Sequence, residues 1–176
     1  MSHLRTALGG AALALTLVGP AAAAEPSFFA DPIYDSPLFN FEGFYVGLQG
    51  GIVYAAAPAT FSGLVGVAIG ANFMLSEAIL AGLEFQGDVY FGGGGFAGGD
   101  MLLLARVGGF LSDNLMIYGA AGGGMINGAG SYALGAGVEL PISNPFSVRG
   151  EVLGTGTWGG GFDGVRATAG VLWHMN

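Results

Sequence analysis

The sequence predicts an all-β fold, an eight-stranded antiparallel transmembrane up-and-down β-barrel, on three observations. Apolar residues make up 52% of the 176 residues and charged residues only 9%, whereas soluble domains typically carry about 25% charged residues. From Gly43 onward, segments long enough to cross a bilayer as strands alternate with glycine-rich and turn-forming clusters. Within most of these segments, charge falls on one face only, at a period of two.

The first 24 residues, MSHLRTALGGAALALTLVGPAAAA, predict a secretory signal peptide. Arg5 precedes an apolar core over 7–18, and Ala22 and Ala24 fit cleavage after Ala24. The core is too short for a spanning helix, which argues against the alternative of a retained anchor. Removing Arg5 from the 4 basic residues leaves 3 against 12 acids, a net charge of −9 that argues against nucleic-acid binding.

Residues 25–42, EPSFFADPIYDSPLFNFE, form a second segment before the barrel over 43–176. It combines three prolines with four acidic residues and shows no regular period. We therefore expect a weakly ordered, Pro-rich periplasmic segment. The chain has no cysteine, so disulfides do not contribute to the exported product.

The barrel region divides into eight predicted strands, at 43–54, 61–75, 79–91, 100–111, 115–127, 131–142, 146–158 and 164–175. Short turns at SEA, SDN and SNP follow the even-numbered strands, and the connections AAAPAT, GGGGFAGG, GAG and GGGFDG follow the odd-numbered ones. Outer-membrane barrels have an even strand number, short periplasmic turns and longer outer loops. The pattern predicts a Gram-negative outer-membrane protein with both termini in the periplasm.

Alternation separates the two faces of most strands. The first strand sets Phe44, Val46 and Leu48 against Tyr45, Gly47 and Gln49. The second strand is mostly apolar on both faces, and the fifth, 115–127, does not indicate its orientation. The third, fourth, sixth, seventh and eighth strands place their charges opposite their large apolar residues. The predicted lumenal charge network comprises Glu84, Asp88, Arg106, Glu139, Arg149, Glu151 and Arg166.

Seven charges are too few for a water-exposed surface, so we expect the apolar face to meet lipid and the charged face to line the lumen. A soluble, lipocalin-like barrel would have the reverse arrangement. Aromatic residues gather near both strand ends, which predicts interfacial belts that include Tyr45, Tyr90 and Tyr118. Small residues on the charged face, such as Gly66 and Gly70, predict water-filled gaps in the lumen.

Small lipid-facing residues predict close lateral packing with a second copy or another membrane protein. These residues are Gly50, Gly63, Ala105, Gly150 and Gly154. A helical membrane protein is an alternative, because residues 43–76 carry no charge and Gly66 and Gly70 are four apart. The stretch GAAGGGMINGAG argues against it, since each glycine costs a helix about 1 kcal/mol relative to alanine.

The order of features resembles the small outer-membrane β-barrels of α-proteobacteria, porin-family proteins related to the outer-membrane protein A barrel. The matching pieces are the signal peptide, DPIYDSP, FEGFYVGLQGG and the closing strand GVRATAGVLWHMN. The resemblance implies that the barrel assembly machinery reads the last strand as a signal, through Gly170, Trp173 and Met175. Met175 stands where the family usually has phenylalanine.

Motifs for catalysis or cofactor binding are weak in this sequence. GGGGFAGGD lacks the GK[ST] of a phosphate loop, and His174 is the one histidine after the signal peptide, which excludes a histidine metal cluster. Serines such as Ser147 leave a lipid hydrolase or acyltransferase as a remote alternative. We expect no enzyme activity, no cofactor and no metal.

The expected function is a structural role in the cell envelope. The expected partners are outer-membrane lipid, the barrel assembly machinery, and either a second copy or a neighbouring membrane protein. Eight strands leave an interior about wide enough for its own side chains. A narrow porin for ions or small solutes, and a surface receptor or adhesin for a small ligand or host molecule, are the alternatives.

Overall fold

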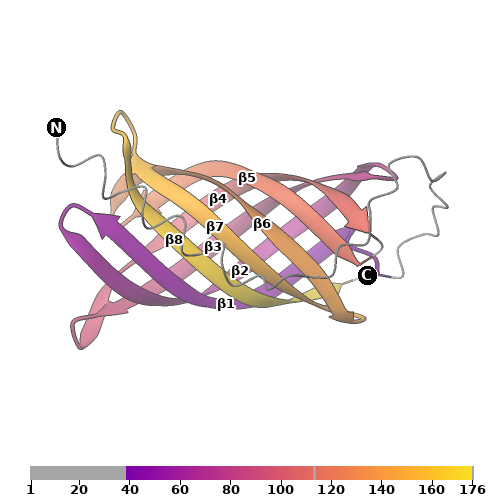
Figure 1. Ribbon diagram of the computed structural model, residues 1–176, viewed down its shortest axis with the longest axis horizontal. Coiled ribbons are helices and arrows are strands. Elements are labelled where there is room, and N and C mark those ends of the chain that lie inside the picture. Colours follow the sequence, from indigo (N-terminus) through magenta and orange to yellow (C-terminus); the bar gives the residue numbers. More distant parts are fainter. Residues whose placement is uncertain (1–38, 113, 176) are drawn as a thin grey trace, which may run out of the picture. The chain divides into compact units, whose positions relative to one another are not determined.

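The computed structural model describes residues 39–112 and 114–175, which form a closed antiparallel barrel. The predicted signal peptide and most of the Pro-rich segment lie outside the described residues. Each strand pairs with its sequence neighbours, and β1 pairs with β8 to close the ring (Figure 1). The strands are β1 (Gly43–Ala56), β2 (Ala59–Ser76), β3 (Ile79–Gly92), β4 (Gly95–Ser112), β5 (Leu115–Ile126), β6 (Ala129–Ser143), β7 (Phe146–Thr157) and β8 (Phe162–Met175). The predicted fold class is confirmed.

We call the two ends of the barrel proximal and distal. The proximal end holds the start of β1, the end of β8 and the connections after β2, β4 and β6; the distal end holds the other four connections. Six connections are two residues long, and only the one after β7, 158–161, has four. The expected alternation of short turns with longer loops is therefore wrong.

Glycine chemistry explains two of the three tight distal turns. Gly93 and Gly94 have φ angles of 59° and 94°, and Asn127 and Gly128 have 49° and 80°. Two consecutive positive φ angles are those of a type I′ turn, which joins antiparallel strands directly. The glycine-rich stretch predicted as a loop instead continues β3 and β4, so β4 begins at Gly95 rather than at residue 100.

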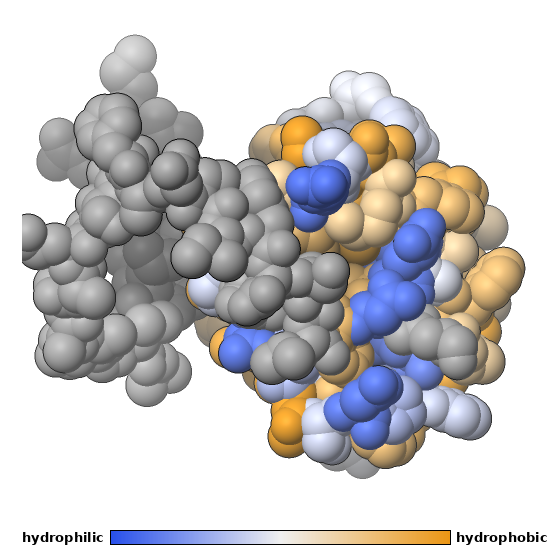
Figure 2. All heavy atoms as spheres, turned by 90° about the vertical axis from the view of Figure 1, so that its right-hand side faces the viewer, coloured by the Kyte–Doolittle hydropathy of each residue, from blue (hydrophilic) through white to orange (hydrophobic). Residues whose placement is uncertain are grey.

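Large apolar side chains cover the outer wall of the barrel. Exposed examples from four strands are Leu48 (71%), Val65 (54%), Leu83 (55%) and Leu103 (57%). Figure 2 looks at the proximal end, where hydrophilic residues cross the middle and hydrophobic ones surround them. A barrel with an apolar outer band and a polar interior is matched to lipid, so the fold is a transmembrane one. No helix in the described ranges is long and apolar enough to span a membrane.

The structure settles the orientation of β5. Met116 and Tyr118 are buried inside the barrel, whereas Ile117 and Met125 are exposed outside. The sequence could not show this, because both faces of β5 carry only apolar or small residues.

Three tyrosines predicted for the interfacial belts lie inside the barrel instead. Tyr45, Tyr90 and Tyr118 are at most 4% exposed, and each ring hydroxyl donates a hydrogen bond to a buried carboxylate. A phenol can be buried where its hydroxyl finds an acceptor, and the lumenal acids supply that acceptor. The belt assignment was wrong for these residues.

Candidate functional site

Charged side chains share the lumen with buried apolar ones such as Leu102, Leu104 and Leu153, and the charged groups are sealed from solvent. Eight acidic and arginine side chains point into the barrel, and each is at most 5% exposed. They come from β3, β4, β6, β7 and β8. The set is Glu84, Asp88, Asp100, Arg106, Glu139, Arg149, Glu151 and Arg166. The structure places all seven predicted network residues in the lumen and adds Asp100, which shares the inward face of β4 with Arg106.

Glu84 on β3 is the centre of the network. Its Oε2 lies 3.0 Å from Arg106 Nη1 and also contacts Arg149 Nη1. The Tyr45 hydroxyl donates to the same oxygen and accepts from Arg106. Two arginines and a phenol therefore meet one carboxylate, and charge-assisted bonds of this kind are stronger than neutral ones.

Arg106 extends the central cluster toward β6. Its Nη2 lies 3.2 Å from Glu139 Oε2, and its guanidinium carbon lies 3.9 Å from the centre of the Tyr118 ring. An arginine over an aromatic face gains a cation–π attraction, which is larger where water is excluded. The stacked ring thus fixes the plane in which Arg106 reaches its two carboxylates.

A second cluster surrounds Arg166 on β8. Its Nη1 lies 2.7 Å from Asp88 Oδ2 and 2.8 Å from Asp100 Oδ2. Asp88 and Asp100 are directly paired in register across β3 and β4, and the Tyr90 hydroxyl also donates to Asp100. Arg166 is therefore the single cation between two facing carboxylates.

Two glutamines join the clusters. Gln86 accepts from Arg166 Nη2, and its amide nitrogen contacts Glu84 at 2.5 Å and Glu151 at 2.9 Å. A neutral amide can both accept and donate, so it links an arginine to carboxylates without adding charge.

Gln49 makes the second link. It accepts from Arg149 Nη2 at 2.8 Å and donates to Asp88 Oδ1 at 2.8 Å. The eight buried charges, three arginines and five acids, sum to 3 − 5 = −2. Among the described residues, no group of three histidine, cysteine, aspartate or glutamate side chains is arranged to hold a metal ion.

The structure brings Ser147 and His174 together near the proximal end, as a hydrolase would require. However, His174 Nε2 contacts both Ser147 Oγ (3.1 Å) and Glu139 Oε1 (2.9 Å), and Ser147 donates to that same Glu139 oxygen at 2.7 Å. A catalytic triad uses the two imidazole nitrogens for different partners. Phe39 and Phe41 also pack edge-on against the imidazole ring, so the cluster fits a packed polar layer.

The last residues before β1 close the proximal end. Phe39 and Phe41 are 3% and 1% exposed, and their rings lie 4.8 Å apart. Asn72 donates to the Phe41 carbonyl at 2.9 Å, and Phe110 packs 5.5 Å from the Phe41 ring. We expected weak order throughout 25–42; residues 39–42 depart from that expectation because two aromatic rings find an apolar site inside the barrel.

Lumenal glycines provide the space for these large side chains. A Cβ at Gly70 would lie 2.3 Å from the Tyr45 hydroxyl, and a Cβ at Gly137 would lie 2.3 Å from the Tyr118 hydroxyl. Gly66 is filled in the same way by the Asp88 carboxylate. The expected water-filled gaps are wrong at these sites, because neighbouring side chains occupy them.

The distal end remains open to a shallow depth. A hollow of about 500 Å³ is lined by residues of several strands, including Phe61, Tyr90, Ser131, Thr155 and Asp163. We call this hollow the distal vestibule. Tyr90 links it to the Arg166 cluster, because the Tyr90 hydroxyl donates to Asp100. The hollow therefore ends where the charge network begins.

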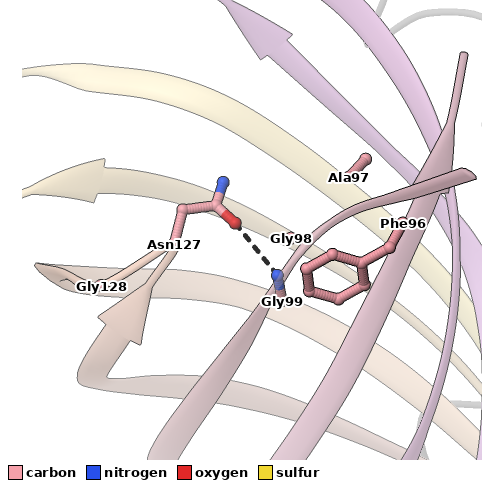
Figure 3. Close-up of a pocket in the computed structure, with 6 residues that line it drawn as sticks. All are labelled: Phe96, Ala97, Gly98, Gly99, Asn127 and Gly128. Carbon is pink, nitrogen blue, oxygen red and sulfur yellow. Dashed lines mark hydrogen bonds between the residues drawn. The ribbon is translucent and has the colours of Figure 1, made fainter.

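A second hollow of about 540 Å³ lies between the distal ends of β4 and β5 (Figure 3). Asn127 holds its wall: the side-chain oxygen accepts from the Gly99 amide at 3.0 Å, and the Asn127 amide donates to the Gly99 carbonyl at 2.8 Å. Phe96 forms the other side (Figure 3). The lining carries no charged side chain, so it offers no catalytic group.

The predicted assembly signal lies on the strand that closes the barrel. Gly170 and Trp173 pair with Gln49 and Val46 of β1, and Trp173 and Met175 are about half exposed on the outer wall. Their use as a recognition signal stays a prediction.

The small outer-wall residues lie partly side by side. Gly50 and Gly150 both pair with Ala169, which places three small residues in a row across β1, β8 and β7. Lateral packing through this row also stays a prediction.

Comparison with models of known protein families gave no match, and comparison with curated proteins gave none either. The similar solved structures include two that each cover about three quarters of this chain. A structure titled "De novo design of transmembrane beta-barrels" is 13% identical to this chain, with a TM-score of 0.48. The match covers 78% of this chain and 100% of that chain. The KdgM porin is 9% identical, with a TM-score of 0.40, and covers 75% of this chain and 99% of its own. The fold described above rests on the strand pairing of this chain and not on these similarities.

Proposed function

We propose that this chain is a small integral outer-membrane barrel with a structural role in the envelope of a Gram-negative cell. The observation that carries the proposal is the contact of Glu84 with both Arg106 and Arg149, which joins β3 to β4 and β7 through the lumen. A buried ion-pair network of this kind occupies the space that a solute would need. The Phe39 and Phe41 rings form a second barrier at the proximal end.

The remaining parts of the proposal concern placement and partners. The signal peptide delivers the chain to the periplasm, the barrel assembly machinery inserts it, and both termini remain periplasmic. The apolar outer wall contacts outer-membrane lipid. The shared use of one imidazole nitrogen by Ser147 and Glu139 supports a non-enzymatic role.

Single-channel recording of the purified protein in planar bilayers tests the closed lumen. We expect no discrete current steps under conditions in which a known porin gives them. Current steps in the wild type whose size changes in a Glu84→Gln variant would mean that ions pass through the lumen. That result would favour the narrow porin. The distal vestibule is the observation that keeps this second candidate in view.

Envelope integrity tests the structural role separately. A strain that lacks the gene should become more permeable to detergents and large dyes, and both the wild type and a Glu84→Gln variant that still folds should restore the barrier. Unchanged permeability in the deletion strain would contradict the role.

A further inference from the structure

All basic side chains of the barrel are directed inward. The chain has 4 basic residues, of which Arg5 lies in the predicted signal peptide. Arg106, Arg149 and Arg166 are 1%, 3% and 1% exposed. The outer wall and rims of the described barrel therefore present no lysine or arginine, whereas Glu42, Glu77 and Asp163 are exposed there.

The distal rim carries aromatic rings, hydroxyl groups and one acidic side chain instead. Its most exposed rings are Phe61 (71%), Phe96 (76%), Trp158 (65%) and Phe162 (62%). Between them stand exposed polar residues, namely Thr60, Thr157 and the acidic Asp163. Aromatic rings settle at the head-group level of a bilayer, and hydroxyls bind esters or sugars by hydrogen bonds.

Anionic head groups would find no cationic partner on this surface. Each basic residue near a leaflet of net negative charge adds attraction, whereas an acidic residue is repelled by it. We infer that the rims of this barrel fit a leaflet whose head groups carry no net negative charge, zwitterionic or uncharged. The inference rests on the proposed membrane insertion and adds the lipid class.

Refolding into vesicles tests the lipid class. The urea-unfolded barrel would be diluted into phosphatidylcholine vesicles and into vesicles rich in phosphatidylglycerol with the same acyl chains. Folding would be followed by tryptophan fluorescence and protease protection. We expect roughly tenfold slower folding into the anionic vesicles at low salt. The difference should nearly vanish at 1 M salt, where the screening length falls to about 3 Å.

Two rim variants assign the effect to the exterior. Asp163→Asn and Glu77→Gln should each narrow the difference between the two lipids, whereas the neutral exchange Asn114→Gln should not. Using both acids guards against one variant that folds poorly for other reasons.

The outcomes separate the two proposals. Equal or faster folding into anionic vesicles would overturn the lipid inference and leave the membrane barrel intact. Fast folding into anionic vesicles only when magnesium is present would also overturn it, in favour of cation bridges between rim acids and phosphates. Failure to insert into either lipid would instead contradict the proposed function.

Discussion

Arg149 and Glu84 form an ion pair across the lumen, although their strands, β7 and β3, are not neighbours in the barrel. The strand order places Glu139 of the neighbouring β6 directly opposite Arg149. The directly paired Glu139 instead contacts Arg106 and His174. Cross-lumen pairing ties distant strands together, so the network stabilises the closed ring and not only adjacent strand pairs.

Replacing Arg149 with methionine should destabilise the barrel. The change keeps an unbranched side chain but leaves Glu84 with one arginine and Gln49 without its donor. Breaking a buried ion pair costs about 3 to 5 kcal/mol, and in a wet lumen the cost would be about 1 kcal/mol or less. Urea unfolding from lipid vesicles measures the difference. Val148→Leu, on the outer wall, is the matched control, and a midpoint for Arg149→Met equal to wild type would reject the buried network.

Arg166→Met should cost more than Arg149→Met. Asp88 and Asp100 have Arg166 as their only ion-pair partner among the described residues, whereas Glu84 keeps Arg106. Adding Asp100→Asn should recover part of the loss, because it removes one unpaired buried charge. A double-mutant cycle in urea measures the coupling. Additive effects of the two changes would show that the side chains do not interact.

The strands and faces could be predicted because lipid and lumen impose opposite demands on alternate residues. Leu83 and Phe85 are exposed to lipid, while Glu84 between them is fully buried. The connections could not be read in the same way. Glycine permits a turn but also continues a strand, so Gly95 and its neighbours looked like a loop in the sequence.

The partners within the site were hidden for a different reason. Which side chains meet across a barrel depends on strand tilt and stagger, and these do not follow from alternation alone. Tyr45 looked like an interfacial aromatic because it lies near a strand end, but its side chain is directed into the lumen and donates to Glu84. The one available signal was its place on the same face as Gln49, opposite Phe44.

Gly70→Ala should destabilise the barrel, because the new methyl group would meet the Tyr45 ring. A Cβ at Gly70 would lie 2.3 Å from the ring hydroxyl and 2.4 Å from the carbon that bears it. Overpacking of this kind typically lowers the free energy of unfolding by about 1 to 3 kcal/mol. Gly63→Ala is the control on the same strand, where the nearest atom would be 3.8 Å away. Equal unfolding midpoints for the two variants would contradict the tight packing.

Single cysteines should report the topology, since the chain has none of its own. Gly160→Cys lies in the distal connection after β7, and Asn114→Cys lies in the proximal connection after β4. With both termini in the periplasm, a membrane-impermeant maleimide should label position 160 on intact cells and position 114 only after lysis. Labelling in the opposite order would reverse the proposed orientation.

Phe41→Ala should show whether the residues before β1 belong to the folded barrel. The ring is 1% exposed and packs against Phe39 and Phe110, so its removal would leave a cavity at the proximal end. Truncating a buried phenylalanine costs about 3 to 5 kcal/mol. Phe44→Ala, three residues later and 66% exposed on the outer wall, is the control and should cost much less. If urea unfolding from lipid gave the same midpoint for Phe41→Ala as for the wild type, the segment would not contribute to the fold, and the proximal barrier in the proposed function would be lost.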